Sequence, residues 1–314
     1  MALITDIDKA VQLLLEGALV ALPTETVYGL GANALDTKAV AKVFKAKNRP
    51  SFDPLIVHVA SIDQAREVAD LNDAAIALLE RFSPGPLTIV VPKKDVVPDL
   101  VTSGHPTVAV RIPDHPMTLE VIRRSGLSIA APSANPFGFT SPTTAAHVQE
   151  QLGENIDAVL DGGPCGVGLE STIVDLCGKP KVLRLGGLAL EELESVLGAL
   201  EVQTSSSNPK APGMLSSHYN PGAKIRLFDD FDDLRRNIDN VDNSNVGLLV
   251  MSSEMVGDNV FNLSPILNDV EAASRLFIGL RELRASGFKE IWTHYLPEEG
   301  LGRAINDRLK RAAN

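Results

Sequence analysis

The residues best suited to chemistry lie in polar segments that directly follow short apolar runs. The longest, PTETVYGLGAN at residues 23–33, comes straight after the apolar run 19–22. Ligand sites of α/β folds lie at the carboxyl ends of strands, so this segment is a candidate site. Its Gly-Leu-Gly lacks the third glycine of the dinucleotide-binding fingerprint, which favours a tight turn, and the sequence contains no Gly-x-x-x-x-Gly-Lys-Ser/Thr phosphate loop. A nucleotide would have to be held by other residues.

Two further segments offer groups that suit phosphate. Lys47 and Arg49 stand two apart where a predicted helix ends, and Pro50 holds the backbone extended there. Their charges could converge on a polyanion or cap the helix carboxyl end, and the local sequence leaves both interpretations open. Ser133 and Asn135 also follow an apolar strand. Because Ser133 has no Gly-x-Ser-x-Gly context, we interpret it as a hydrogen-bonding residue and not as a hydrolase nucleophile.

Two titratable side chains lie inside apolar strands. Arg111 is near the end of the run VAVRIP, and a buried arginine needs an anionic partner. That partner could be a structural Asp or Glu, while the open strand end suits a bidentate clamp on a substrate carboxylate. His58 lies similarly in LIVHV, where a structural role is commoner for an isolated histidine.

Ser171, with Arg184 beyond it, belongs to a glycine-rich segment at 166–172 that a hairpin-like turn would also explain.

These segments need a sheet to position them. Through about residue 200, short β-branched runs alternate with helical periodicity, which is typical of α/β layers. Strands are predicted at residues 19–22, 55–59, 87–91, 108–112, 128–131, 158–160, 172–176 and 182–185. Helices are predicted over 8–16, from the N-cap Asp36 to before Pro50, from Ser61, and from Ser141 to Gly153.

A second unit follows a segment rich in turn formers. Residues 203–213 have no apolar period and predict a linker. Beyond it, strands are predicted at 225–228, 246–250 and 290–293, with a long helix over 269–286. We therefore predict an α/β fold with an N-terminal domain at 1–200, an interdomain linker at 201–222, and a smaller Rossmann-like α/β domain at 223–314.

Composition limits the function classes. With 314 residues, the chain exceeds what one core usually supports, and its 44% apolar and 22% charged residues are those of a globular protein. A net charge of -11 argues against a protein dominated by nucleic-acid binding, although Lys42, Lys45, Lys47 and Arg49 suggest a local basic cleft. No apolar run reaches the roughly 20 residues of a membrane span, and the first residues do not read as a secretory signal, so we expect a cytoplasmic location.

Four motifs in order resemble the YrdC-like domain of threonylcarbamoyl-adenylate synthases. They are PTETVYGLG at 23–31, the K-x-R of Lys47 and Arg49, the S-x-N of Ser133 and Asn135, and ESTIVD at 170–175. The segments APGM at 211–214 and HYNP at 218–221 resemble the linker of the longer, two-domain Sua-type members. The resemblance implies a YrdC-like twisted, open mixed sheet with flanking helices in the first domain.

The resemblance implies an enzyme, a nucleotidyltransferase that makes L-threonylcarbamoyladenylate for the threonylcarbamoyladenosine modification of tRNA. Threonine's amine would capture bicarbonate-derived carbon dioxide, and the carbamate would attack the α-phosphate of ATP and expel pyrophosphate. Mg²⁺ is the implied cofactor, with no metal ligands assigned. The implied partners are L-threonine, bicarbonate, ATP and the machinery that transfers the threonylcarbamoyl group to tRNA. A weak tRNA contact is also expected, and no membrane.

Roles for individual residues are implied by the same resemblance. The catalytic residues would be Lys47, Arg49, Ser133 and Asn135. Threonine would be held by Thr26, His58, Arg111 and Ser171, with Arg111 on its carboxylate. ATP would be surrounded by Lys47, Arg49, Asp53, Thr107, Ser133, Asn135, Ser141, Arg184 and Tyr219. The linker segment around Tyr219 is expected to fold over the ATP cleft, with packing against the second domain alone as the alternative.

Two positions depart from the family pattern. Asp53 stands where the family usually carries Asn, which would bring a negative charge towards ATP unless it faces the metal. The stretch MLSSHY at 214–219 lacks the basic residue that often precedes His-Tyr, which weakens the case for pyrophosphate contacts there.

Two rival interpretations carry less support. An RNA-binding or translation-associated module without catalysis would use the basic cluster, but the net acidity argues against it. A carbamoyl-transfer enzyme of hydrogenase maturation shares the YrdC-like domain, but the two cysteines present cannot supply that family's zinc segments.

Overall fold

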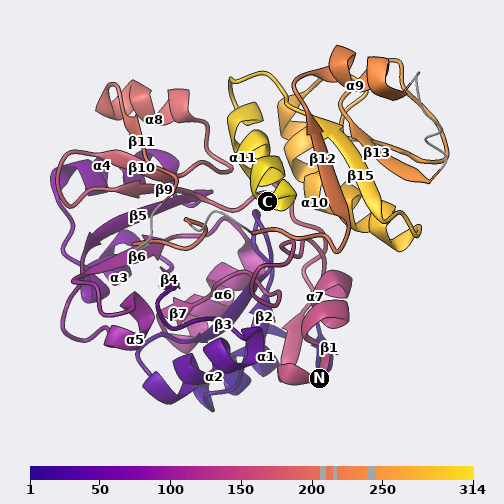
Figure 1. The fold of residues 1–314 in the computed structure, drawn as a ribbon. Coiled ribbons are helices and arrows are strands. Elements are labelled where there is room, and N and C mark those ends of the chain that lie inside the picture. Colours follow the sequence, from indigo (N-terminus) through magenta and orange to yellow (C-terminus); the bar gives the residue numbers. More distant parts are fainter. Residues whose placement is uncertain (206–209, 215–217, 239–244) are drawn as a thin grey trace. The chain divides into compact units, whose positions relative to one another are not determined.

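The structure is a computed structural model that describes residues 1–205, 210–214, 218–238 and 245–314 (Figure 1). Internal contacts divide the chain into two compact units. The N-terminal unit comprises Met1–Phe137, Ser141–Gly166 and Glu170–Leu215, and the C-terminal unit comprises Gly138–Thr140, Val167–Leu169 and Ser216–Asn314. Of the linker predicted at 201–222, residues 201–205 and 210–214 belong to the N-terminal unit and 218–222 to the C-terminal unit, while 206–209 and 215–217 lie outside the described residues.

The N-terminal unit is built on a mixed sheet, which has 11 strands within the described residues. Their order is β1-β8-β2-β3-β7-β4-β6-β5-β9-β10-β11. The strands are β1 (Ala2–Ile4), β2 (Val20–Leu22), β3 (Gly29–Asn33), β4 (Ile56–His58), β5 (Leu87–Pro92), β6 (Thr107–Arg111), β7 (Ile129–Ala130), β8 (Ala158–Leu160), β9 (Thr172–Asp175), β10 (Lys181–Arg184) and β11 (Glu201–Val202). Because β4 and β6 pair in parallel, their last residues His58 and Arg111 are neighbours in register.

The two faces of this sheet have different covers. Side chains alternate along each strand, so Val108 and Val110 join one core while Ala109 points to the other face. The first core is shared with α2 (Thr37–Lys47), α3 (Ile62–Val68), α4 (Asp73–Phe82), α5 (Asp99–Thr102), α7 (Ala145–Leu152), which η1 (Gly153–Asn155) continues, and α8 (Leu190–Leu197).

On the opposite face, helices cover the end of the sheet formed by β2, β7 and β8. There Leu14 of α1 (Ile7–Leu15) and Ile122 of α6 (Pro116–Ser125) pack against Val20 and Leu160. The rest of that face, over β4, β6, β5 and β9, carries Ile56, Ala109 and Val90 in a separate apolar cluster. Helices therefore leave this part of the face to the loops and the linker.

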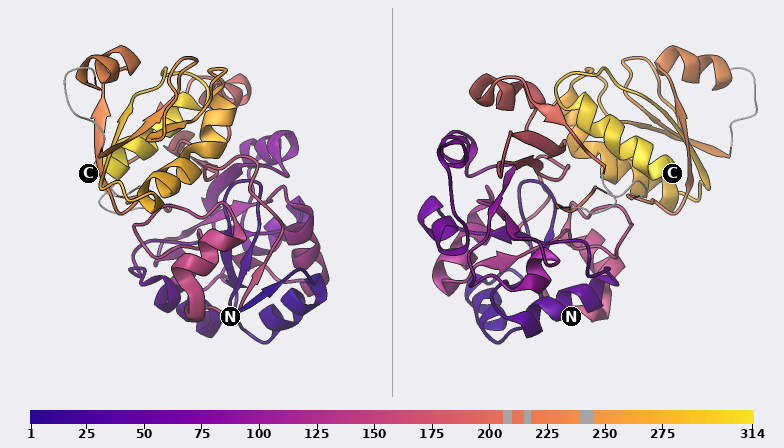
Figure 2. Two further views of the ribbon diagram at one scale, coloured as in Figure 1. Left: turned by 90° about the vertical axis from the view of Figure 1, so that its right-hand side faces the viewer. Right: turned by 60° about the vertical axis from the view of Figure 1, so that its left-hand side comes forward.

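The C-terminal unit holds a smaller, parallel sheet in the order β12-β15-β13-β14. Its elements are β12 (Lys224–Phe228), α9 (Phe231–Ile238), β13 (Val246–Val250), β14 (Val260–Asn262), α10 (Asp269–Ala285), β15 (Glu290–His294) and α11 (Gly302–Ala313). Leu234 of α9 packs on one face with Leu248 and Trp292. A Cβ on Gly247 would lie 3.2 Å from Leu283, so α10 packs closely on the other face, and α11 lies beside α10 (Figure 2).

The predicted fold class is confirmed: a mixed sheet with flanking helices precedes a smaller α/β unit with a parallel sheet. Each strand predicted from the sequence is present within a residue or two of its expected bounds. The prediction missed β1, β3, β11 and β14, and it placed the helix α7 to start at Ser141 although it begins at Ala145. The loop predicted at 23–33 ends early, because Gly29–Asn33 pairs with β2 and β7 as a strand.

No helix in the described parts of the chain is long and apolar enough to cross a lipid bilayer.

Candidate active site

The loop between β2 and β3 carries the first polar group of the site. Thr24 Oγ1 donates to the carbonyl of Val27 at 2.6 Å and accepts from the backbone N–H groups of Thr26 and Val27, both at 3.2 Å. The hydroxyls of Thr24 and Thr26 are 2.8 Å apart. Since the single proton of Thr24 is used by Val27, Thr26 donates to Thr24. The loop is thus folded around its own hydroxyls, and Thr26 is buried.

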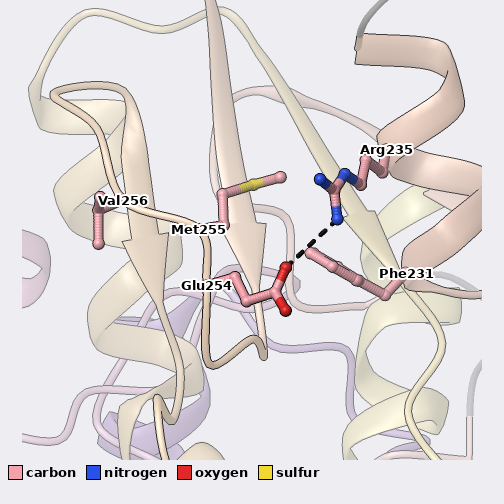
Figure 3. Close-up of a pocket in the computed structure, with 5 residues that line it drawn as sticks. All are labelled: Phe231, Arg235, Glu254, Met255 and Val256. Carbon is pink, nitrogen blue, oxygen red and sulfur yellow. Dashed lines mark hydrogen bonds and ion pairs between the residues drawn. The ribbon is translucent and has the colours of Figure 1, made fainter.

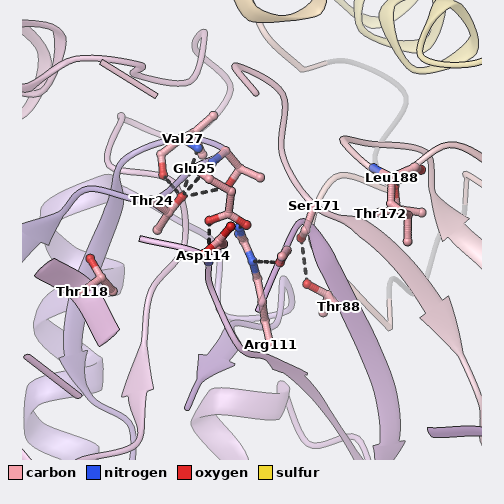
Figure 4. A network of polar contacts seen from close by, with 12 residues as sticks. Thr24, Glu25, Val27, Thr88, Arg111, Asp114, Thr118, Ser171, Thr172 and Leu188 are labelled. Atoms are coloured by element: carbon pink, nitrogen blue, oxygen red, sulfur yellow. Dashed lines mark hydrogen bonds and ion pairs between the residues drawn. The ribbon is translucent and has the colours of Figure 1, made fainter. Parts of the chain in front are cut away.

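Arg111 meets a carboxylate from this loop. Its Nη2 lies 2.6 Å from Glu25 Oε1, and its Nε donates to the carbonyl of Gly85 at 3.4 Å. The second oxygen of Glu25 accepts the backbone N–H of Asp114 at 2.9 Å. Figure 4 shows Glu25 between Arg111 and Asp114. The anionic partner that a buried arginine requires is therefore present in the chain itself.

His58 lies beside Arg111 at the end of β4. Its Nδ1–H donates to the carbonyl of Ile56 at 3.3 Å, and the ring is buried. Burial, and after it the positive charge of Arg111, lowers the pKa of His58 to about 3. His58 is consequently neutral at physiological pH and can offer hydrogen bonds but no charge.

Ser171 connects the strands β5 and β10 through its hydroxyl. Its Oγ lies 2.7 Å from Thr88 Oγ1 and accepts from Arg184 Nη2 at 3.0 Å, while Arg184 Nε donates to the Ser171 carbonyl at 3.0 Å. A Cβ on Gly186 would lie 2.2 Å from the Glu170 carbonyl oxygen, so only glycine allows this close approach of the chain after β10. Arg184 and Ser171 are held together by this packing.

Lys47, in the last turn of α2, organises the segment after β7. Its Nζ donates to the carbonyl of Ser133 at 2.6 Å and to that of Asn135. Burial, and secondly the charge of Arg49, lowers the pKa of Lys47 well below its ordinary value. Asn48 follows in a left-handed conformation and ends the helix. The structure thus brings together Lys47, Ser133 and Asn135, three of the four predicted catalytic residues.

Arg49, the fourth, forms a buried ion pair with Asp53. Its Nη2 lies 2.9 Å from Asp53 Oδ2, with 4% and 2% of the two side chains exposed. Arg49 also donates to the carbonyls of Asp53 and Pro54, at 3.0 Å and 2.9 Å. Burial raises the pKa of Asp53, against the opposing charges of Arg49, Lys47 and Arg184. Asp53 Oδ2 therefore pairs with Arg49, while the buried Asp53 Oδ1 has no hydrogen-bond partner in the described residues, and the contact of Asp53 with ATP stays a prediction.

The remaining predicted residues are more scattered. Ser141 Oγ donates to Glu170 Oε1 at 2.5 Å, next to Ser171 in the chain. Thr107 begins β6 and faces the same side as Arg111, but four residues of strand, about 13 Å, separate the two. Tyr219 belongs to the C-terminal unit, where its ring stacks on Phe277 at a centroid distance of 5.5 Å and lies under Arg308.

Residues 210–214 of the linker cover the sheet face over β4, β6, β5 and β9, which the helices leave open. Ala211 and Met214 pack on the apolar cluster that contains Ile56 and Ala109. The carbonyl of Pro212 accepts from Arg184 Nη1 at 3.3 Å. Residues 210–214 therefore lie against the face of the sheet near Arg184, and their role as a lid over ATP stays a prediction. The ring of Tyr219 stacks on Phe277 of the C-terminal unit, and its place near the nucleotide stays a prediction.

The basic cluster predicted at residues 42–49 is divided between the surface and the interior, because Lys42 and Lys45 are exposed. Lys47 and Arg49 are buried, and exposed Lys42 donates to the carbonyl of Gly17 at 2.6 Å. Two of the four predicted charges therefore face solvent, and the expected tRNA contact stays a prediction. Within the described residues, no group of three or more His, Cys, Asp or Glu side chains could hold a metal ion.

The C-terminal unit has a pocket of its own. It encloses about 200 Å³ and is lined by Phe231, Arg235, Glu254, Met255 and Val256 (Figure 3). Arg235 and Glu254 form an exposed ion pair across it at 3.3 Å. The residues singled out from the sequence do not line this pocket, so the candidate site remains in the N-terminal unit.

Sequence reasoning missed two members of the site. Glu25 lies within the quoted PTETVYGLG motif, and a carboxylate in a loop after a strand could have been matched to the buried Arg111. Thr88 stands among apolar residues in LTIVV, and strand alternation could have placed it on the face of Arg111.

Similarity to known proteins covers both units. A family model described as "Telomere recombination" matches residues 12–186, and one described as "Threonylcarbamoyl-AMP synthase, C-terminal domain" matches residues 188–314. A protein of Pyrococcus abyssi named threonylcarbamoyl-AMP synthase is 43% identical over 312 residues, covering 95% of this chain and 91% of its own length. A Bacillus subtilis protein of the same name is 40% identical, covering 98% and 92%. The crystal structure of P. abyssi Sua5 complexed with L-threonine matches with a TM-score of 0.92 at 42% identity, covering 98% of this chain and 94% of that one.

Proposed function

This chain belongs to the threonylcarbamoyl-AMP synthase family, and we propose that it converts L-threonine, bicarbonate and ATP into threonylcarbamoyl-AMP, pyrophosphate and water. The observation that carries the proposal is the grouping of buried cations with hydroxyls on one sheet face: Arg111 with Glu25 and His58, and Arg184 with Ser171. The product serves the modification of tRNA. We place the reaction in the cytoplasm, where ATP and tRNA are found.

In the proposed reaction, the threonine carbamate attacks the α-phosphorus of ATP. The new bond joins a carbamate oxygen to phosphorus, and the bond to the bridging oxygen breaks, with its electron pair leaving on pyrophosphate. Such a transfer depends on position and on positive charge around the phosphates, and needs no protein nucleophile. The reaction class is therefore nucleotidyl transfer.

Arg49 and Arg184 supply the positive charge near the phosphates. Arg49 and Arg184 are buried and held by carbonyl groups, so their positions are set before ATP arrives. Lys47 is 1% exposed and spends two of its three N–H bonds on Ser133 and Asn135. We assign Lys47 to orienting the Ser133–Asn135 turn, which offers a hydroxyl and an amide to ATP.

Threonine would lie at the other end of the site. Arg111 would bind its carboxylate, while the hydroxyls of Thr26 and Ser171 and the neutral ring of His58 would offer hydrogen bonds. Magnesium would arrive with ATP, since Mg²⁺ is usually held by phosphate oxygens and one or two carboxylates. Its chemistry would be to spread the phosphate charge, and the buried Asp53, already paired with Arg49, gives no clear ligand set.

Residues 210–214 fit the role of a cover over this site. They pack on the sheet face and accept a hydrogen bond from Arg184, so they would exclude water from the adenylate. The product would then pass to the machinery that transfers the threonylcarbamoyl group to tRNA.

Pyrophosphate release tests the proposal. We expect it only when L-threonine, bicarbonate and Mg-ATP are all present, with L-serine much slower, because a site that binds a hydroxyl and packs a methyl distinguishes the two. Each component is omitted in turn, and mass spectrometry identifies the adenylate. Equal rates with serine or valine would contradict the proposal, and a non-catalytic RNA-binding module would release no pyrophosphate at all.

A further inference from the structure

We infer that Glu25 and Arg111 together form a paired-charge subsite for the head group of the amino-acid substrate, in which Glu25 binds the α-ammonium. The identity of the substrate rests on the proposed function. The two side chains come from separate parts of the chain, the β2–β3 loop and the end of β6, and meet at 2.6 Å. Glu25 would thereby select for amino acids and against other carboxylates.

Each oxygen of the Glu25 carboxylate has one partner and can still accept a further hydrogen bond. Oε1 contacts Arg111 Nη2, and Oε2 accepts the backbone N–H of Asp114 at 2.9 Å. A carboxylate offers about four lone-pair positions, so each oxygen can accept another hydrogen bond. The side chain keeps 13% of its surface exposed, which lets a ligand reach it.

Arg111 also keeps capacity for a ligand. Its hydrogen bonds to the described residues come from Nε, to Gly85, and from Nη2, to Glu25. These leave Nη1 for a substrate carboxylate beside the Glu25 contact. The guanidinium of Arg111 lies beside the carboxylate of Glu25, so groups bound to the two side chains would be neighbours, as the two charged groups of an α-amino acid are (Figure 4).

Charge balance favours a pair over an arginine alone. Free threonine is a zwitterion, and moving its ammonium into a buried site costs free energy unless a partner compensates it. Asp53 is engaged with Arg49, whereas Glu25 touches the very arginine proposed to bind the carboxylate. Glu25 also directly precedes Thr26, whose hydroxyl is proposed to bind the same substrate.

A structural role for Glu25 gives a different expectation. If Glu25 only occupies Arg111 until a carboxylate displaces it, removing its charge will strengthen the binding of any carboxylate, with or without an ammonium. If it only orients Arg111, its loss will weaken all such ligands equally. Two ligands that differ only in the ammonium therefore distinguish a Glu25 that binds the ammonium from one that only occupies or orients Arg111.

The experiment measures binding by isothermal titration calorimetry, without ATP, to the full-length wild type and to Glu25→Gln. The ligands are L-threonine and its α-hydroxy analogue, in which a hydroxyl replaces the ammonium. We expect the wild type to prefer threonine, and Glu25→Gln to bind threonine about 10- to 100-fold more weakly, the range of a charge-assisted hydrogen bond. The analogue should lose less than about 3-fold or gain affinity, because a neighbouring negative charge has been removed. Glu120→Gln, which breaks an exposed ion pair with Arg124, is the matched control and should change neither affinity.

An unchanged preference for threonine in a folded Glu25→Gln would overturn the inference, as would equal losses or equal gains for both ligands. If Glu25→Gln fails to fold by circular dichroism, Glu25→Asp replaces it. That variant keeps the charge, so it should still prefer threonine; equal binding of the two ligands would again overturn the assignment. A wild type that binds no threonine would contradict the proposed function first, and the inference with it, whereas a threonine-binding wild type isolates Glu25.

Discussion

Arg49 and Arg111 are both buried beside a carboxylate, yet the two ion pairs are built differently. Arg49 pairs with Asp53, four residues on, and donates to two carbonyls of the same turn. Arg111 pairs with Glu25 from a distant loop, and 13% of the Glu25 side chain is exposed, against 2% for Asp53. A pair locked into its own turn is part of the framework, while a partly open pair between two segments can admit a ligand.

The largest effect is expected for Arg49→Ala, which tests whether the Arg49 pair is framework. Removing the guanidinium leaves Asp53 buried without its partner, so unfolding free energy should fall by about 3–5 kcal/mol. Synthesis should fall more than about 100-fold, because a positioned charge near the phosphates is also lost. Urea unfolding and pyrophosphate release measure the two losses.

Two further variants make this test selective. Arg66→Ala breaks an exposed ion pair with Asp63 and should cost less than about 1 kcal/mol. Adding Asp53→Asn to Arg49→Ala removes the stranded charge, so stability should return in part while synthesis stays low. An Arg49→Ala protein with normal stability and activity would show that this pair is no more structural than a surface one.

The next effect is expected for Arg111→Lys, which keeps the charge but loses the planar fork. A lysine cannot hold the Gly85 carbonyl, Glu25 and a substrate carboxylate in one plane. The KM for threonine should rise about 10- to 100-fold and that for ATP less than about 3-fold. Arg123→Lys, on the exposed side of α6, should change neither. A weaker KM for ATP with an unchanged KM for threonine would remove Arg111 from the amino-acid end of the site.

A smaller effect is expected from the linker, which touches the Arg184 side of the site. Met214→Ala removes side-chain atoms that are 2% exposed and pack on the sheet face, which should loosen the cover by about 2–4 kcal/mol. Synthesis should fall about 10-fold as water reaches the adenylate, and limited proteolysis of the linker should become faster. Val202→Ala, at an exposed position of β11, is the control. Unchanged proteolysis and synthesis would show that residues 210–214 do not act as a cover.

Most strands could be predicted because each contains a clear apolar run. The prediction failed where a segment without such a run becomes a strand through hydrogen bonds to neighbouring strands. Gly29–Asn33 reads GLGAN, with small residues and weak strand preference, yet β2 and β7 hold it on either side. The packing around Gly31 is close, since a Cβ there would lie 3.0 Å from the Val20 carbonyl oxygen. Close packing with distant segments decided this element, and a local pattern cannot show it.

The sequence indicated which residues belong to the site more fully than it indicated which of them contact one another. Burial in an apolar strand indicated that Arg111 needs an anion, but the sequence alone does not show that Glu25, 86 positions away in the loop after β2, is that anion. Likewise, Asp53 could be recognised as unusual, although its contact with Arg49 depends on the turn that Pro50 begins. Which side chains form an ion pair depends on how the strands and loops are arranged in the fold, and the type of a single residue does not determine it.

The smallest effect at neutral pH is expected for His58, which lies beside Arg111 and should report on the electrostatics of that pair. Its pKa is lowered to about 3 by burial and by the charge of Arg111, while an unfolded histidine titrates near 6.5. Between these values the unfolded state binds more protons, so stability falls as pH falls from about 6.5 towards 3. From pH 7 to 5 the loss from this residue is about 2 kcal/mol.

His58→Gln should abolish that part of the pH dependence while His115 and His294, whose pKa values burial also lowers, keep theirs. Unfolding free energies at pH 7 and pH 5 for wild type and variant give the difference directly. Threonine affinity of the wild type should show no step from His58 between about pH 6 and 8, because the ring stays neutral throughout. An equal pH dependence in both proteins would mean that His58 takes up its proton in the folded state near the ordinary pH. The charge of Arg111 would then have little effect on His58. Glu25 would compensate the charge of Arg111 as fully as Asp53 compensates that of Arg49.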